Sequence, residues 1–285
     1  MIKRIITAIV ALVVFIPTLI FSDTWAFPLI MAVAAVVGCY ELISCVGQKK
    51  NILILIPILA YAAAFPILMR YMNYLWLTPD QMLPEFMKLA IGITMVLMLY
   101  VLSVSVFMNR KISIADTGVI LAGCIYIVAA FTSIVYIRDK IEFGQYIFFM
   151  VFICAWVTDT FAYFVGRLIG KHKLIPSVSP KKTIEGAIGG VIGCVISTVI
   201  FGVILENFIL DGEKANYLIL AISGIFISVV SQTGDLIMSL IKRHYNIKDY
   251  GKILPGHGGV LDRFDSVISV SLMIAFICTY FNLFS

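Results

Sequence analysis

The sequence predicts an all-α polytopic integral membrane protein with about nine transmembrane helices. Composition is the first reason: of 285 residues, 61% are hydrophobic and 13% are charged, whereas a water-soluble domain is usually about 45–50% apolar and about 25% charged. The mean hydropathy is +1.05. The second reason is that apolar runs of about 20 residues, the length of a helix across a bilayer, recur along the chain. Such a chain needs lipid as its solvent.

Nine apolar segments are candidate spans. They cover residues 5–21, 24–46, 52–69, 86–107, 117–137, 145–166, 184–210, 217–240 and 264–283. The first begins with Lys3 and Arg4 as a signal peptide does, but it lacks a small-residue cleavage site, so we expect it to be retained. No repeat or soluble domain interrupts the series. We divide the chain into N-terminal scaffold helices, 1–140, and C-terminal catalytic helices, 141–285.

The distribution of basic residues predicts the orientation. With the N-terminus in the cytoplasm, the cytoplasmic segments hold 16 of the 21 Lys and Arg residues and the outer segments hold 5. This excess favours an inside N-terminus and an outside C-terminus in the cell membrane. It also places the two long basic loops, 167–183 and 241–263, together on the cytoplasmic side. The net charge of +5 is spread over short loops, which favours lipid headgroups over nucleic acid as the partner.

Ionisable residues inside apolar spans are costly and usually functional. Asp159 shares a helix face with Tyr163, Gly166 and Arg167, because these residues are spaced by four, seven and eight. A second polar stripe on one face leads through Asp235 into the long loop; its members are Ser228, Gln232, Asp235, Ser239 and Lys242. For Glu41 in the second span we expect snorkelling or a basic partner. The six cysteines all lie in apolar segments and are interpreted as small buried residues.

The loop at 241–263 combines three features of a phosphate and metal site. Gly256, Gly258 and Gly259 permit positive φ and close approach of the backbone to a ligand. Basic residues supply charge for phosphates; they are Lys242, Arg243, Lys248, Lys252 and Arg263. Asp262 and Asp265 supply the hard oxygen ligands that magnesium prefers.

The other basic loop, 167–183, predicts a second anion site. Ser179 or Thr183 can cap the next helix, with Lys181 and Lys182 near its positive end. An ordinary solvated charge run is the alternative interpretation. After this loop, Gly186, Gly189, Gly190 and Gly193 follow small-xxx-small patterns that predict close helix packing.

Three motifs resemble those of the bacterial phosphatidate cytidylyltransferases, also called CDP-diacylglycerol synthases. The longest reads Ser239-x2-Lys242-Arg243-x4-Lys248-Asp249-x-Gly251-x2-Leu254-Pro255-Gly256-His257-Gly258-Gly259-x2-Asp262-Arg263-x-Asp265. The others are Ser179-Pro-Lys-Lys-Thr-x-Glu185-Gly186 and Asp159-Thr-x-Ala-Tyr163-x2-Gly166-Arg167. The resemblance covers about residues 155–270, and the N-terminal half is similar only in being a set of apolar spans.

The resemblance implies that CTP and phosphatidate react to give CDP-diacylglycerol and pyrophosphate with Mg²⁺, that a second cation shares the site, and that the protein is a homodimer. For the metal it implies Asp235 and Asp262, with Asp159 and Asp265 as outer members. We expect Lys242, Arg243, Lys248 and Lys252 to hold the nucleotide phosphates, and Arg167, Lys181 and Lys182 to hold the lipid phosphate. The remaining candidates are Asp249, His257 and Arg263 for catalysis, and Ser179, Thr183, Ser239, Gly258 and Gly259 for substrate binding.

Two other functions fit a polytopic chain of this kind. A CTP-dependent polyprenol or phytol kinase also uses a nucleotide in the membrane, although the motifs favour the cytidylyltransferase. A transporter with Asp159 and Asp235 as an intramembrane carboxylate pair is the non-enzyme alternative, but the internal repeats common in transporters are absent from the sequence. A CDP-alcohol phosphotransferase is excluded, because its Asp-Gly-x-x-Ala-Arg run does not occur.

Overall fold

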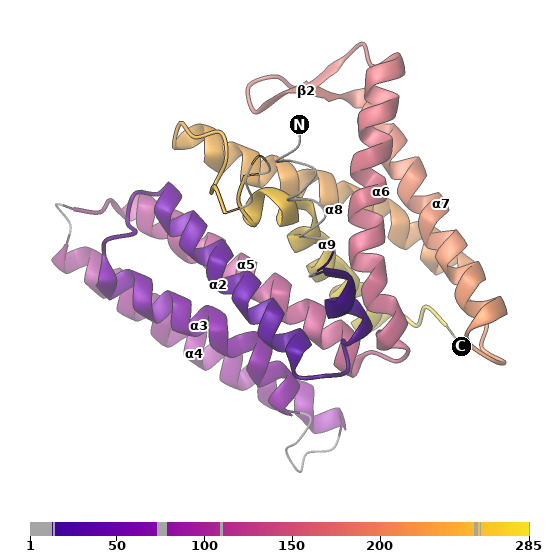
Figure 1. Cartoon of the computed structure of the whole chain (residues 1–285), viewed down its shortest axis with the longest axis horizontal. Coiled ribbons are helices and arrows are strands. Elements are labelled where there is room, and N and C mark those ends of the chain that lie inside the picture. Colours follow the sequence, from indigo (N-terminus) through magenta and orange to yellow (C-terminus); the bar gives the residue numbers. More distant parts are fainter. Residues whose placement is uncertain are drawn as a thin grey trace. The chain divides into compact units, whose positions relative to one another are not determined.

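The computed structural model describes residues 13, 15–72, 79–108, 111–253, 256 and 258–284. Residues 15–20 are helical, and eight further helices and one short two-stranded hairpin have defined bounds. The helices are α2 (Ala26–Cys45), α3 (Ile52–Tyr71), α4 (Pro79–Phe107), α5 (Ile114–Lys140), α6 (Gly144–Ile169), α7 (Ile184–Phe208), α8 (Tyr217–His244) and α9 (Leu261–Tyr280). The hairpin strands are β1 (Lys173–Ile175) and β2 (Ser179–Thr183) (Figure 1).

The prediction of an all-α membrane protein is confirmed. Among the described residues, seven helices, α2 to α8, are long and apolar enough to cross a membrane. The first expected span, 5–21, lies mostly outside the described residues. The last expected span, 264–283, forms the 20-residue helix α9, which is not among those seven, so the number of spans stays a prediction. The basic loop 167–183, for which no strand was predicted, contains the antiparallel pair β1–β2.

The chain forms two compact units. The first consists of Met1–Asp139 and Tyr245–Arg263, and the second of Lys140–His244 and Phe264–Ser285. The loop between α8 and α9 therefore belongs to the first unit, although the helices on either side of it belong mainly to the second. Whether the scaffold and catalytic parts divide at 140 stays a prediction.

In the first unit, α2 packs against α5 through small residues. The Cys39 thiol lies 3.9 Å from the Cys124 carbonyl oxygen, and Leu42 lies directly over Gly123. A buried ionic cluster closes the opposite end of α2. There the Arg70 guanidinium pairs with Asp139 and donates to three backbone carbonyls, those of Ser22, Asp23 and Thr24. These hydrogen bonds, all made within the described part of the chain, explain how a charge can lie in the core.

In the second unit, α6 and α7 lie side by side along much of their length (Figure 1). A Cβ atom on Gly186 would lie 2.6 Å from the Ala162 carbonyl oxygen, and one on Gly189 would lie 2.6 Å from the Val165 side chain. The predicted small-xxx-small contact is therefore confirmed. Because the glycines of α7 carry no side chain, the backbones of the two helices can come close together. This contact holds α6 against the start of α7, where the hairpin joins them.

None of the six cysteines forms a disulfide bond, as predicted from their apolar surroundings. Four of them are buried.

Candidate active site

The hairpin between α6 and α7 brings its basic residues to the start of α7. Thr183 ends β2 and caps α7, because its side-chain oxygen accepts a hydrogen bond of 3.1 Å from the Gly186 amide. His172 is tied to the same helix through Glu185, whose carboxylate lies 2.6 Å from the imidazole Nδ1. The predicted capping role of Thr183 is thus confirmed. Ser179, the other candidate cap, begins β2 and pairs with Ile175.

Three carboxylates from three helices of the second unit converge near this hairpin. Asp159 comes from α6, Asp235 from α8 and Asp265 from α9. The carboxyl groups of Asp235 and Asp265 are within hydrogen-bonding distance of each other, and both interact electrostatically with Asp159. The hydroxyl of Ser266 donates a 3.0 Å hydrogen bond to Asp159. We call Asp159, Asp235 and Asp265 the carboxylate cluster.

Two lysines compensate the charge of the carboxylate cluster. The Lys182 ammonium group lies 2.6 Å from an Asp235 oxygen, and the side chains of both residues are about one-quarter exposed. Lys242 is buried on α8 and interacts electrostatically with Asp235 and Asp265. The Ser239 hydroxyl lies 3.4 Å from Asp235. Ser239, Asp235 and Lys242 thus share one side of α8, as the polar stripe predicted.

A cavity of about 440 Å³ opens beside Asp159 and Asp235. This volume is in the range of small-molecule sites. Its lining combines the two aspartates with four cationic side chains, namely Arg167, Lys173, Lys181 and Lys182. On its α6 wall, Arg167 donates a 3.0 Å hydrogen bond to the Tyr163 hydroxyl. A cavity of this charge pattern suits a ligand that carries phosphate groups together with a cation.

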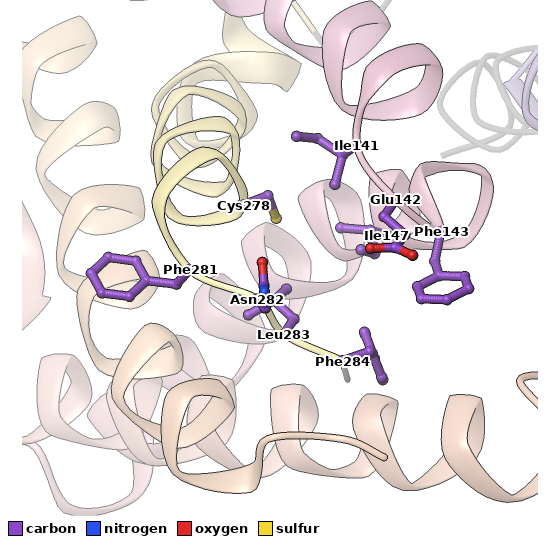
Figure 2. Close-up of a pocket in the computed structure, with 9 residues that line it drawn as sticks. All are labelled: Ile141, Glu142, Phe143, Ile147, Cys278, Phe281, Asn282, Leu283 and Phe284. Carbon is purple, nitrogen blue, oxygen red and sulfur yellow. The ribbon is translucent and has the colours of Figure 1, made fainter. Parts of the chain in front are cut away.

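A second cavity in the same unit is far smaller, about 40 Å³. Residues 141–147 and 278–284 enclose it, and Figure 2 shows the side chains that line it. This volume has room for only a few water molecules. The larger cavity is therefore the candidate substrate site.

The loop in the first unit has the backbone that its glycines predicted. Gly256 has φ of 80° and Gly258 has φ of 86°, while Gly259 is buried and not among the residues of positive φ. Asp262 stabilises this fold, because one of its oxygens accepts hydrogen bonds from the amides of Tyr250 (2.8 Å) and Gly259 (2.9 Å).

The loop is also anchored where it begins. The Tyr245 hydroxyl donates a 2.7 Å hydrogen bond to Asp116 at the start of α5. Burial, together with this bond to a carboxylate, raises the pKa of Tyr245. The phenol therefore stays protonated and keeps donating at physiological pH.

The remaining candidates, four basic residues and one aspartate, reach solvent. Arg243, Lys248, Asp249, Lys252 and Arg263 are all exposed. Solvated side chains of this kind are available to a soluble nucleotide. The catalytic candidate His257 lies outside the described residues, as do Leu254 and Pro255 of the same motif.

The expectation for Glu41 was wrong. The Glu41 side chain does not reach water, since it is 2% exposed, and it pairs with no basic residue that the structure describes. It accepts hydrogen bonds from the backbone amides of Val260 (3.0 Å) and Leu261 (2.9 Å). Sequence reasoning missed this contact because backbone amides leave no pattern in side-chain composition. The only signal was the carboxylate itself, placed in an apolar helix without a charged neighbour.

Within the described residues, no group of three or more His, Cys, Asp or Glu side chains is arranged as a ready-made metal cage. The donor set of the carboxylate cluster nevertheless suits magnesium, which takes few protein carboxylates and fills its other positions with water and substrate phosphate. Two cationic lysines already sit against these carboxylates, which indicates that the cluster requires positive charge.

Comparison with known proteins agrees with this chemistry. The profile of the Cytidylyltransferase family matches residues 2–281. The chain belongs to this family. Phosphatidate cytidylyltransferase of Bacillus subtilis (strain 168) is 33% identical over 280 residues, 98% of each chain. Its counterpart in Staphylococcus haemolyticus (strain JCSC1435) is 35% identical over 274 residues, 94% of this chain and 95% of the relative. The protein of that name in Staphylococcus aureus (strain COL) is 32% identical over 267 residues, again 94% and 95%.

Membership in the family makes the chain a nucleotidyltransferase enzyme of the membrane. The match extends over α2 to α9 and is not confined to the motifs of the C-terminal half. The N-terminal helices are therefore part of the family's fold.

Proposed function

We propose that this chain is a phosphatidate cytidylyltransferase, which transfers CMP from CTP to phosphatidate and releases CDP-diacylglycerol and pyrophosphate. The observation that carries the proposal is the carboxylate cluster with Lys182 and Lys242, placed beside a 440 Å³ cavity that four cationic side chains line. Both substrates are polyanions that need neutralisation before they can approach each other. The relatives named above support the choice of substrates.

The chemistry requires positioning more than acid–base catalysis. A phosphate oxygen of phosphatidate attacks the α-phosphorus of CTP, the bond from that phosphorus to the β-phosphate oxygen breaks, and pyrophosphate leaves with the electron pair. The second pKa of a phosphate monoester is near 6, so the attacking oxygen is already largely ionised at neutral pH. Proton removal is therefore not the main task. Charge neutralisation and alignment supply most of the catalysis in phosphoryl-type transfers.

We assign the metal to the carboxylate cluster, with Asp235 as the main ligand and Asp159 and Asp265 beside it. Asp262 lies three residues before Asp265 on α9, so the two residues share a helix face. Its two backbone hydrogen bonds make Asp262 a structural residue of the loop as well as a candidate ligand. Bound Mg²⁺ would neutralise the triphosphate and polarise its α-phosphorus. A second cation would find acidic partners in the same cluster.

We assign the basic residues by their surroundings. Arg167, Lys181 and Lys182 line the cavity between α6 and α7, and exposed apolar residues such as Phe164 and Ile188 cover these helices. A lipid phosphate could bind there while its acyl chains stay in the bilayer. The nucleotide phosphates are assigned to Lys242, Arg243, Lys248 and Lys252. Of these, the last three are exposed.

The distribution of basic residues supports a cytoplasmic site in the cell membrane, where CTP is available, with the N-terminus inside. The family resemblance supports a homodimer. Thiol-labelling of single cysteines introduced at positions 3 and 213 tests the orientation: only position 3 should be protected from an impermeant reagent in intact cells. Mass determination of the protein in detergent tests the dimer.

A transfer assay with purified full-length protein tests the function. Vesicles containing phosphatidate are supplied with Mg²⁺ and with CTP labelled either in cytidine or at the γ-phosphate. We expect cytidine label in the lipid and γ-label in pyrophosphate. The opposite distribution, with γ-label in lipid and CDP in solution, would identify a lipid kinase instead. Absence of both products, with uptake of a solute into sealed vesicles, would favour a transporter.

A further inference from the structure

Glu41 joins α2 to the loop that carries Asp262. Both lie in the first unit. The two Glu41 oxygens each accept one backbone amide, those of Val260 and Leu261, at 3.0 and 2.9 Å. These amides belong to the residues that enter α9, which begins at Leu261. A carboxylate in this position satisfies two donors that a helix start would otherwise leave unpaired, and it interacts favourably with the positive end of the helix dipole.

The loop backbone is fitted around this carboxylate. A Cβ atom on either Gly251 or Gly259 would overlap the Glu41 carboxyl group. Two glycines of the long motif are therefore required for the approach to Glu41, although for Gly259 the sequence suggested an approach to a ligand. Both oxygens of this buried carboxylate accept backbone amides, and two glycines pack against it. The contact is therefore specific to a carboxylate at this position.

The Glu41 contact leads directly to Asp262. Gly259 packs on Glu41 and donates its amide to Asp262, which also holds the Tyr250 amide. Glu41 and Asp262 thus accept hydrogen bonds from neighbouring amides of one short backbone segment, residues 259–261. If Glu41 is removed, residues 259–261 lose two of their three amide hydrogen bonds to these carboxylates, and the Asp262 carboxylate loses its fixed support.

We propose that Glu41 is a positioning residue for the transfer reaction, which acts by fixing the 259–262 backbone and through it the orientation of Asp262. This inference rests on the proposed function. It gives the N-terminal helices an indirect part in the chemistry, since α2 supplies the residue. The expected size is that of an outer-shell partner of a metal ligand, a loss of about 10–100-fold in activity.

The experiment compares the variants Glu41→Gln, Glu41→Ala, Asp262→Asn and the double variant Glu41→Ala/Asp262→Asn in the full-length protein. Gln keeps one acceptor oxygen and should lose about 10-fold in kcat, whereas Ala should approach 100-fold, with the larger share in kcat and in the Mg²⁺ requirement rather than in KM for CTP. The double variant should lose no more than Asp262→Asn alone, because both changes act through one group.

Asp139→Asn provides the control for simple destabilisation. Asp139 is also a buried carboxylate of the first unit, but it belongs to the Arg70 cluster before α2, and Ala26 is roughly 22 Å along that helix from Glu41. This variant should lower the melting temperature and leave kcat and the Mg²⁺ requirement of the folded protein unchanged. If Glu41→Ala behaves like Asp139→Asn, or if its loss multiplies with that of Asp262→Asn, the proposal is overturned.

Hydrogen exchange of the loop amides tests the positioning role of Glu41 independently of activity. In Glu41→Ala, the amides of Tyr250 and Gly259 should exchange at least about 10-fold faster, although Glu41 does not bind them itself. Unchanged exchange at these two amides would refute the positioning role. If the unmutated protein failed to transfer CMP, the proposed function would fail, and the exchange result would still show whether Glu41 fixes the loop.

Discussion

The ammonium group of Lys182 lies 2.6 Å from a carboxylate oxygen of Asp235 and joins the end of β2 to the middle of α8. The pair is about one-quarter exposed and borders the large cavity. Lys182 therefore occupies a position where a cation is needed and where a phosphate can reach it.

Asp235→Asn should reduce CMP transfer at least about 100-fold, because it removes one negative charge from the carboxylate cluster and keeps the shape of the side chain. The loss should appear at saturating Mg²⁺ in an assay of pyrophosphate release. Asp211→Asn is the matched control, since Asp211 is exposed in the connection after α7 and should retain full activity. Equal activity of the two variants would exclude the cluster from the reaction.

Lys182→Gln should separate metal binding from substrate binding. Without the lysine, the carboxylate cluster loses a competing cation, so the protein should bind Mg²⁺ more tightly while KM for the anionic substrates rises. Calorimetric titration with Mg²⁺ alone and steady-state kinetics measure the two effects. Weaker Mg²⁺ binding in the variant would mean that Lys182 supports the cation site instead of occupying it. Lys173→Gln, which removes another cation from the wall of the same cavity, serves for comparison.

Gly186→Ala should destabilise the protein by about 1–3 kcal/mol. The added Cβ would lie 2.6 Å from the Ala162 carbonyl oxygen and 2.9 Å from the Thr183 hydroxyl, so α6 and α7 must separate or the cap must break. Gly118→Ala is the control, because nothing lies within 4 Å of a Cβ there; it should be neutral or slightly stabilising. Thermal unfolding in detergent compares the two, and equal melting temperatures would contradict the tight contact.

Arg70→Met should cost about 3–5 kcal/mol of stability, because it leaves the buried Asp139 carboxylate without its main partner and three carbonyls without a donor. The exposed pair Lys88–Glu85, at 2.6 Å, offers the comparison: Lys88→Met should change stability by less than about 1 kcal/mol. Unfolding by denaturant in mixed micelles measures both. A small effect at Arg70 would show that Arg138 alone can hold Asp139.

The helices could be predicted because the length of each apolar run can be read from the sequence. The seven candidate spans coincide with expected segments. The partnership of Asp159 with Asp235 was predicted from the family resemblance and, as an intramembrane pair, in the transporter alternative. Their helix positions follow from spacing, but which helices meet depends on glycine contacts such as that of Gly186 with Ala162. The hairpin at 173–183 was missed, because Pro180 and four basic residues within 171–182 resemble an irregular loop more than a strand pair.

Glu41 also bears on how the protein is made. Its carboxylate accepts a hydrogen bond from an amide that lies 219 residues further along the chain. At a synthesis rate of about 5–20 residues per second, α2 is complete roughly 10–40 s before that amide exists. During this interval a carboxyl group sits in an apolar helix without its final partners, which is costly in lipid. The cell must therefore shelter α2 at the insertion machinery, or keep Glu41 protonated, until α8 and the loop behind it have arrived.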